Sequence, residues 1–221
     1  MDDKERLTVL ETVLEQMLKP IKGIPLYLII RSICGKNVIK FEKENPDDIA
    51  LLKKLEIAIG ACGAAVTADP IRRPRPNEVG NDIEAYVFKA LKDVGLVPKP
   101  PTTAGGKAQS TGYPDILVLD EKKRPTYLEC KIFDEGTEPT TMRSFYLSPS
   151  KNTKVSLDAR HLLLAFGMVA ESVPDSRDSF YRPRSFKLID LHDLQCDVKY
   201  EFNSDNRRLY APGMMLLEGK L

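Results

Sequence analysis

The stretch Gly112-Tyr113-Pro114-Asp115-Ile116-Leu117-Val118-Leu119, followed by Pro125-Thr126-Tyr127-Leu128-Glu129-Cys130-Lys131-Ile132, decides the fold of this chain. It predicts two short apolar strands joined by a charged turn at residues 120–124. Side chains alternate along a strand, so Glu129 and Lys131 share one face while Cys130 faces the other way. Pairing of the strands would place Asp115 beside Glu129. Two carboxylates with a lysine at their edge suit Mg²⁺ and a phosphate ester.

This pattern resembles the PD-(D/E)XK nuclease superfamily, written here as Pro114-Asp115 and Glu129-Cys130-Lys131. The resemblance covers residues 77–170. It implies an α/β fold with a mixed central sheet flanked by helices, a restriction-endonuclease-like core. It also implies phosphodiester hydrolysis in which Asp115 and Glu129 hold Mg²⁺, with the Cys130 carbonyl as a third ligand. Lys131 would then position or deprotonate the attacking water.

A helix is predicted over residues 81–95, before the first strand. Its apolar residues fall on one helical face, at Ile83, Val87, Leu91 and Val94. Gly95 is a natural stop signal. Glu84 has two interpretations: the resemblance implies a catalytic carboxylate that supports the metal site, whereas Asn81 three residues earlier allows a capping box.

The rest of the chain predicts an N-terminal α/β lobe over residues 1–70 and a nuclease core over residues 77–221. The lobe would hold an amphipathic helix at 5–19, strands at 25–33 and 38–41, and a helix starting at Asn45-Pro46. The proline-rich residues 69–76 predict a stiff linker. In the core, residues 155–170 predict an apolar helix, and 185–191 and 197–202 predict strands.

The net charge of the 221 residues is only +1, so nucleic-acid binding would depend on local groups. Two segments are predicted to contact DNA: the loop that leads to Asp115 and the segment after the Glu-x-Lys strand. Their contact residues are Lys107, Gln109, Ser110, Arg143, Ser148, Lys151 and Lys154. The alternatives are a plain exposed loop, and a strand and turn that bury Phe145 and Leu147. Further basic patches lie at residues 72–75 and 177–187.

Cellular location is suggested by two features. The four cysteines are far apart, which fits free thiols in a reducing cytoplasm rather than a disulfide framework. No apolar run approaches the roughly 20 residues needed to span a bilayer. The sequence therefore predicts a cytoplasmic protein without a membrane partner.

The chain's size, and an insertion around a minimal core, resemble a type II restriction endonuclease. The resemblance implies a Mg²⁺-dependent homodimer that cuts double-stranded DNA at a short palindrome, with a cognate DNA methyltransferase in the same system. Two alternatives stay open. One is a structure-specific repair or junction-resolving nuclease, and the other is a non-catalytic nucleic-acid-binding module.

Overall fold

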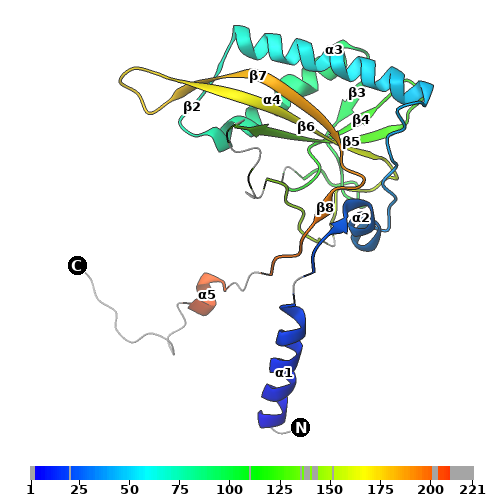
Figure 1. The fold of residues 1–221 in the computed structure, drawn as a ribbon, viewed down its shortest axis with the longest axis vertical. Helices are drawn as coiled ribbons and strands as arrows, with labels where there is room; N and C mark the ends of the chain where they lie inside the picture. The colour runs from blue at the N-terminus through cyan, green and yellow to red at the C-terminus, as the bar shows by residue number, and fades with distance from the viewer. Residues whose placement is uncertain are drawn as a thin grey trace. The chain divides into compact units, whose positions relative to one another are not determined.

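A six-stranded sheet is the centre of the fold in the computed structural model of the protein (Figure 1). Its strands follow the order β2-β7-β6-β5-β4-β3. β5 and β6 are parallel and all other neighbours are antiparallel, so the predicted mixed α/β sheet is confirmed. The structure describes residues 3–19, 21–109, 111–134, 136, 140, 144–150, 152–200 and 204–209.

The sheet is formed by β2 (Ile71–Arg73), β3 (Val97–Lys99), β4 (Ile116–Leu119), β5 (Pro125–Phe133), β6 (Arg160–Ser172) and β7 (Ser179–Asp190). A small sheet pairs β1 (Ile24–Pro25) with β8 (Gln195–Cys196). The helices are α1 (Asp3–Met17), α2 (Leu26–Cys34), α3 (Pro46–Ala68), α4 (Pro76–Asp93) and α5 (Asn206–Leu209). The chain divides into two compact units, residues 24–195 and residues 1–23 with 196–221.

The hydrophobic core lies between the sheet and the helices α3 and α4, and Figure 1 shows α3 along one face of the sheet. α3 begins where the sequence predicts, because the Asn45 side chain accepts hydrogen bonds from the next two free amides, Asp47 N and Asp48 N. Leu128 and Cys130 of β5 point into this core. The odd-numbered side chains of β5 therefore face the opposite side of the sheet.

Residues 26–34 form helix α2, so the strand predicted over 25–33 is wrong. Leu26 and Ile30, one helical turn apart, are its buried residues. Gly35 ends the helix in the left-handed conformation, at φ 64°, and donates to Arg31 O. A run in which almost every residue is apolar shows neither a helical nor a strand repeat, so the sequence alone does not distinguish the two. The strand predicted at 38–41 is reduced to a single bridge between Val38 and Ala159.

The helix predicted over residues 155–170 is also wrong, because this run forms the loop before β6 and most of β6 itself. β6 pairs with β5 on one side and β7 on the other. It is buried on both faces, with Leu162 and Leu164 toward the helices and His161 on the opposite face. A strand buried on both faces reads as a continuous apolar run, which periodicity does not distinguish from a buried helix.

Three smaller corrections concern element ends. Residues 71–73 of the predicted linker form β2, which pairs with β7. α4 begins at Pro76 rather than near Asn81, with Pro76 in the first turn, where its missing N–H is not needed. Residues 197–200 form no strand, and the last two residues of that predicted strand lie outside the described residues. The predicted end of α4 near Gly95 is confirmed, and so is the predicted strand at residues 185–191, which lies within β7 apart from its last residue.

Candidate active site

Asp115 and Glu129 are brought together by the pairing of β4 with β5. The strands are antiparallel, with Ile116 opposite Leu128, so Asp115 and Glu129 are neighbours one step further along. Asp115 N–H donates to Leu128 O at 3.1 Å. Cys130 N–H donates to Asp115 Oδ2 at 2.8 Å. The Asp115 carboxylate is thus fixed beside the strand that carries Glu129.

Glu129 and Lys131 form an ion pair on one face of β5, with Lys131 Nζ 2.8 Å from Glu129 Oε1. Glu129 is only 4% exposed, and its other oxygen, Oε2, has no hydrogen-bond partner among the described residues. Burial, and then the negative charge of Asp115, raise the pKa of Glu129 to about 7, against the opposing effect of Lys131 and Lys154. A buried carboxylate oxygen without a donor is a feature that a bound cation satisfies.

Glu84 lies on α4, and the charge of Asp115 acts on it. Asn81 lies in the second turn of α4 and cannot cap it, so the capping-box interpretation of Glu84 is wrong. Burial, followed by the charge of Asp115, raises the pKa of Glu84 to about 7, while Lys154 and Lys131 lower it. Such effects weaken with distance and screening, so they indicate that Glu84 lies near these charges.

Replacing Glu84 by Gln is expected to lower the single-turnover rate of phosphodiester cleavage about a hundredfold with little change in melting temperature. The substitution removes a charge from the cluster but keeps the size of the side chain. Glu78→Gln, on the same helix, is the matched control and should cleave normally. Equal activity of both variants would remove Glu84 from the site.

Lys154 lies in the connection between β5 and β6, immediately before Val155, and is 3% exposed. The sequence predicts that this lysine contacts DNA, which stays a prediction. The charges of three carboxylates raise its pKa, while burial, the larger effect, lowers it. The carboxylates concerned are Asp115, Glu129 and Glu84.

The other predicted DNA contacts are divided between exposed and undescribed residues. Lys107 and Gln109 are exposed at the end of a turn in which Gly106 N–H donates to Thr103 O at 2.8 Å. Ser148 is exposed as well. The remaining three lie outside the described residues, namely Ser110, Arg143 and Lys151.

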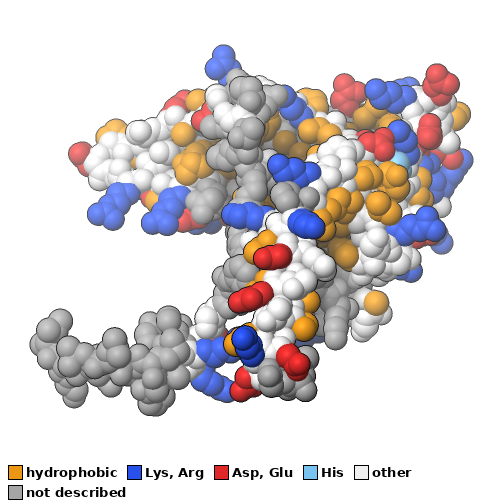
Figure 2. All heavy atoms as spheres, turned by 60° about the horizontal axis from the view of Figure 1, so that its bottom comes forward, with side chains coloured by type: hydrophobic (Ala, Val, Ile, Leu, Met, Phe, Trp, Pro, Cys, Tyr) orange, Lys and Arg blue, Asp and Glu red, His pale blue; other side chains and the backbone are white. Residues whose placement is uncertain are grey.

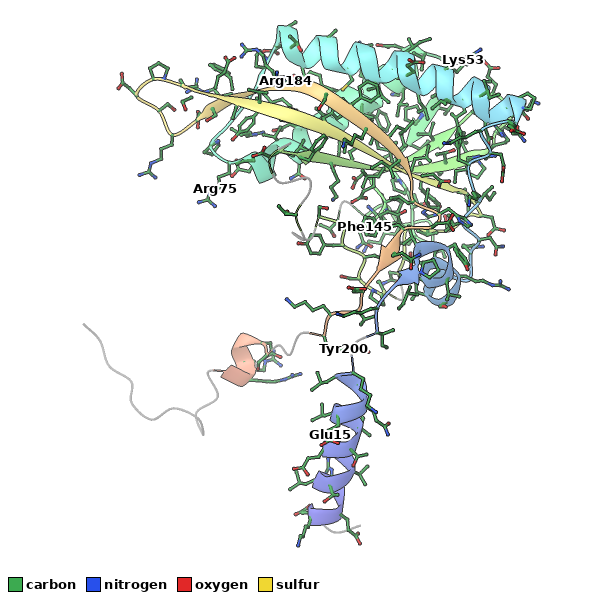
Figure 3. The ribbon with its side chains drawn as sticks, viewed as in Figure 1. Glu15, Lys53, Arg75, Phe145, Arg184 and Tyr200 are labelled. Carbon is green, nitrogen blue, oxygen red and sulfur yellow. The ribbon has the colours of Figure 1, made fainter. Side chains whose placement is uncertain are left out.

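Phe145 connects the segment after β5 to the site. Its ring meets the ring of Tyr113 edge-on, with centroids 5.3 Å apart, and Tyr113 is two residues from Asp115. Figure 3 shows Phe145 on the side of the sheet away from α3. The segment that contains Ser148 therefore passes near Asp115 and the start of β4.

Basic residues outside this region are mixed with acidic ones. On the face shown in Figure 2, Lys and Arg side chains are interspersed with Asp and Glu, in keeping with the net charge of +1. The pairing of β2 with β7 joins the patches at residues 72–75 and 177–187. Arg72 there pairs with Asp178 at 2.8 Å, and Arg182 pairs with Glu171.

The sequence analysis did not identify two tyrosines, Tyr113 and Tyr127, that form hydrogen bonds next to the candidate site. Tyr127 Oη accepts hydrogen bonds from Ser156 N at 3.0 Å and Leu157 N at 3.2 Å. The Tyr113 hydroxyl lies 2.6 Å from His161 Nδ1, and burial lowers the pKa of His161 to about 3, so its ring is neutral. Strand alternation places Tyr127 on the face of Glu129 and could have identified it.

The residues present fit a divalent oxygen-binding ion. Among the described residues, no three His, Cys, Asp or Glu side chains lie together as a ready-formed metal site. Mg²⁺ is usually held by one or two protein carboxylates, with water and substrate phosphate completing its shell. Asp115 and Glu129 match that pattern, and the unpartnered Glu129 Oε2 supplies a ligand atom.

The helix that carries Glu84, the strand that starts at Asp115 and the strand with Glu129 and Lys131 form the core arrangement typical of PD-(D/E)XK nucleases. The model of the type II restriction enzyme MjaV family matches residues 20–213. A protein described as type II restriction enzyme MjaV, from Methanocaldococcus jannaschii, is 36% identical over 236 aligned positions, covering 100% of both chains. The chain belongs to the type II restriction enzyme MjaV family. No solved structure matches.

Membership of this family identifies the reaction as site-specific cleavage of double-stranded DNA by an endonuclease. The predicted nuclease class is confirmed, and the repair-nuclease and non-catalytic alternatives are set aside. Within the described residues, no helix combines the length and apolar character needed to cross a membrane.

Proposed function

We propose that this restriction enzyme uses Mg²⁺ held by Asp115, Glu129 and the Cys130 carbonyl, and that it cuts a short palindromic site. The observation that carries the proposal is the buried Glu129 Oε2, which has no partner in the described structure and lies beside Asp115. Oxygen ligands favour a hard ion such as Mg²⁺ over softer metals. When bound, the ion would stabilise phosphate charge and make water more acidic.

Lys131 orients the attacking water in this mechanism. Burial acts to lower the pKa of Lys131, but its hydrogen bond to Glu129 and the nearby charges outweigh burial, so the pKa is raised and the ammonium persists. A protonated lysine donates hydrogen bonds and does not accept a proton. Lys131 therefore positions water and stabilises developing charge, and Glu84 contributes a third carboxylate at the edge of the site.

Base and phosphate contacts are assigned to the two loops that border the site. Lys107, Gln109 and Ser110 precede Asp115, while Arg143, Ser148 and Lys151 follow β5. Arginine suits guanine edges and lysine suits phosphates. A cognate DNA methyltransferase would protect host sites from this cleavage. The protein would act in the cytoplasm, where its four free cysteines stay reduced.

A homodimer matches the symmetry of a palindrome, and α1 offers a surface for it. None of the described α1 residues is buried. Leu7, Leu10, Leu14 and Met17 follow a three-four-three spacing and are 39% to 60% exposed. That spacing is the apolar seam of a coiled coil, which pairs identical helices about a two-fold axis.

Introducing charge into that seam is expected to dissociate the dimer. Leu10→Asp with Leu14→Asp should reduce the mass measured by sedimentation at micromolar concentration to that of one chain. Thr12→Asp places a single negative charge away from the seam and should leave the dimer intact. A dimer that survives the double substitution would place the interface elsewhere in the chain.

The function is tested by digesting a plasmid of known sequence across a Mg²⁺ titration. Cleavage should require the metal, stop with EDTA, and give discrete fragments whose ends map to one palindrome. Fragments with ends at an asymmetric sequence would contradict the symmetric dimer. Full cleavage in EDTA would contradict the metal site.

A further inference from the structure

Lys154 is a buried cation whose function is not explained by the site described above. It is 3% exposed, whereas Lys131 retains 34% exposure of its side chain. Unpaired charges are costly to bury, and lysines are rarely buried completely. No carboxylate oxygen of the described residues forms an ion pair with Lys154. Its ammonium therefore remains available to a partner from outside the protein.

The backbone around Lys154 is held in place by short hydrogen bonds. Thr153 Oγ1 accepts from Val155 N at 3.1 Å. Tyr127 Oη accepts from the amides of Ser156 and Leu157, as described above. Because Tyr127 shares its strand face with Glu129 and Lys131, these bonds hold the Lys154 segment over the face that carries the site.

Three carboxylates act electrostatically on Lys154. Glu84 comes from α4, Asp115 precedes β4, and Glu129 and Lys131 lie on β5. Glu129 Oε1 is already bonded to Lys131, and Oε2 has no donor. The site thus combines a buried acceptor without a donor and a largely buried lysine that forms no ion pair with a described carboxylate. A metal cation satisfies the first and a phosphate anion satisfies the second.

We propose that Lys154 is a second catalytic lysine, which contacts a non-bridging oxygen of the phosphate that is cleaved. This inference rests on the proposed active site at Asp115, Glu129 and Lys131. In the reaction, the attacking water gives up a proton to solvent as its oxygen forms a bond to phosphorus, the bond to the leaving oxygen breaks, and that oxygen takes a proton from solvent. Lys154 keeps its charge throughout and stabilises the equatorial oxygens as negative charge builds up on them.

A buried catalytic lysine and a lysine on the DNA-binding surface differ in measurable ways. A surface contact to phosphate contributes to DNA affinity and to its dependence on salt, with a slope of about 0.9 per contact. Lys154 is proposed to contact only the phosphate that is cleaved, and that contact strengthens as charge builds up in the transition state, so Lys154 contributes to the rate more than to the affinity. Its positive charge also opposes metal binding nearby, so its removal should not weaken the affinity for Mg²⁺.

The test compares Lys154→Met and Lys154→Arg with Lys131→Met in the full-length protein. DNA affinity and its salt slope are measured in Ca²⁺, cleavage in single turnovers with Mg²⁺, and stability by melting temperature. Lys154→Met should bind DNA within about twofold of the wild type with an unchanged slope. Its cleavage rate should fall about 10²–10³-fold at saturating Mg²⁺, and Lys154→Arg should recover part of that loss.

Three outcomes would overturn the inference. A salt slope reduced by about 0.9 would show an ordinary phosphate contact. A lower melting temperature together with weaker Mg²⁺ binding would show a structural role. Cleavage at the wild-type rate would show no role at all. Failure of the underlying site has a separate signature, because Lys131→Met would then cleave as fast as the wild type.

Discussion

Replacing Asp115 by Asn is expected to abolish DNA cleavage, with a loss of about a thousandfold or more in single-turnover rate. The amide keeps an oxygen that can still accept the 2.8 Å hydrogen bond from Cys130 N, so the local strand geometry is preserved. The negative charge that attracts a divalent ion is removed. The Mg²⁺ concentration for half-maximal rate should therefore rise strongly, and Mg²⁺ binding measured by calorimetry should weaken.

Stability should change in the opposite direction from activity in this variant. The charge of Asp115 raises the pKa of both Glu129 and Glu84, which shows that the metal-free carboxylates repel one another. Without that charge, the metal-free protein should melt at the same or a slightly higher temperature. Glu121→Gln, an exposed acid in the turn after β4, is the control and should cleave normally. Wild-type cleavage by Asp115→Asn would mean that the true site lies elsewhere.

Replacing Asp48 by Ala is expected to destabilise the fold by about 3–5 kcal/mol, because it leaves the buried Arg160 guanidinium without its carboxylate and removes one of the two carboxylates that pair with Arg124. Asp48 is fully buried and its Oδ1 lies 2.7 Å from both Arg124 Nη1 and Arg160 Nη2. Its Oδ2 accepts from Glu42 N at 2.9 Å. The network ties the first turn of α3 to the β4–β5 turn and to the start of β6. Denaturant unfolding measures the loss.

The same network predicts a loss of stability in acid. Burial acts to raise the pKa of Asp48, but the Glu42 amide and the two arginines outweigh it, so the pKa lies below its usual value. A depressed carboxyl pKa contributes stability above its unfolded value, near 3.8, that is lost as pH falls through the folded value. Asp47→Ala is the control, since its pair with Lys122 is exposed and should contribute little to stability. Equal losses in both variants would contradict the role of burial.

Local signals predicted the parts of the fold where sequence and tertiary structure agree. The Asn45 cap, the glycine at 95 and the alternating strands β4 and β5 are set by neighbouring residues. The wrong predictions concern apolar runs that few polar residues interrupt. Residues 26–34 and 160–172 are both rich in aliphatic side chains, yet one is a helix and the other a strand. Pairing with β5 and β7 decided the second case, and no local pattern reports such pairing.

The candidate site divides in the same way. Asp115, Glu129 and Lys131 could be placed together because alternation and one hairpin pairing are enough to position them. The role of Glu84 depended on where α4 begins, and the helix begins at Pro76, more than one turn before the predicted start near Asn81. The burial of Lys154 depends on bonds from Tyr127 to an irregular segment about 30 residues further along the chain. Irregular segments have no period, so their contacts are not readable from the sequence.

The parallel pairing of β5 and β6 has a consequence for fidelity. The connection between these strands runs from residue 134 to residue 159, contains Lys154 and includes the segment proposed to read bases. We expect a displacement of that segment by DNA to reach Lys154, because both belong to the same connection. Base recognition and bond cleavage would then depend on the same connection. A DNA sequence that does not bind this segment correctly would also leave the phosphate without the proposed contact to Lys154. Discrimination would appear in the rate of cutting more strongly than in the strength of binding.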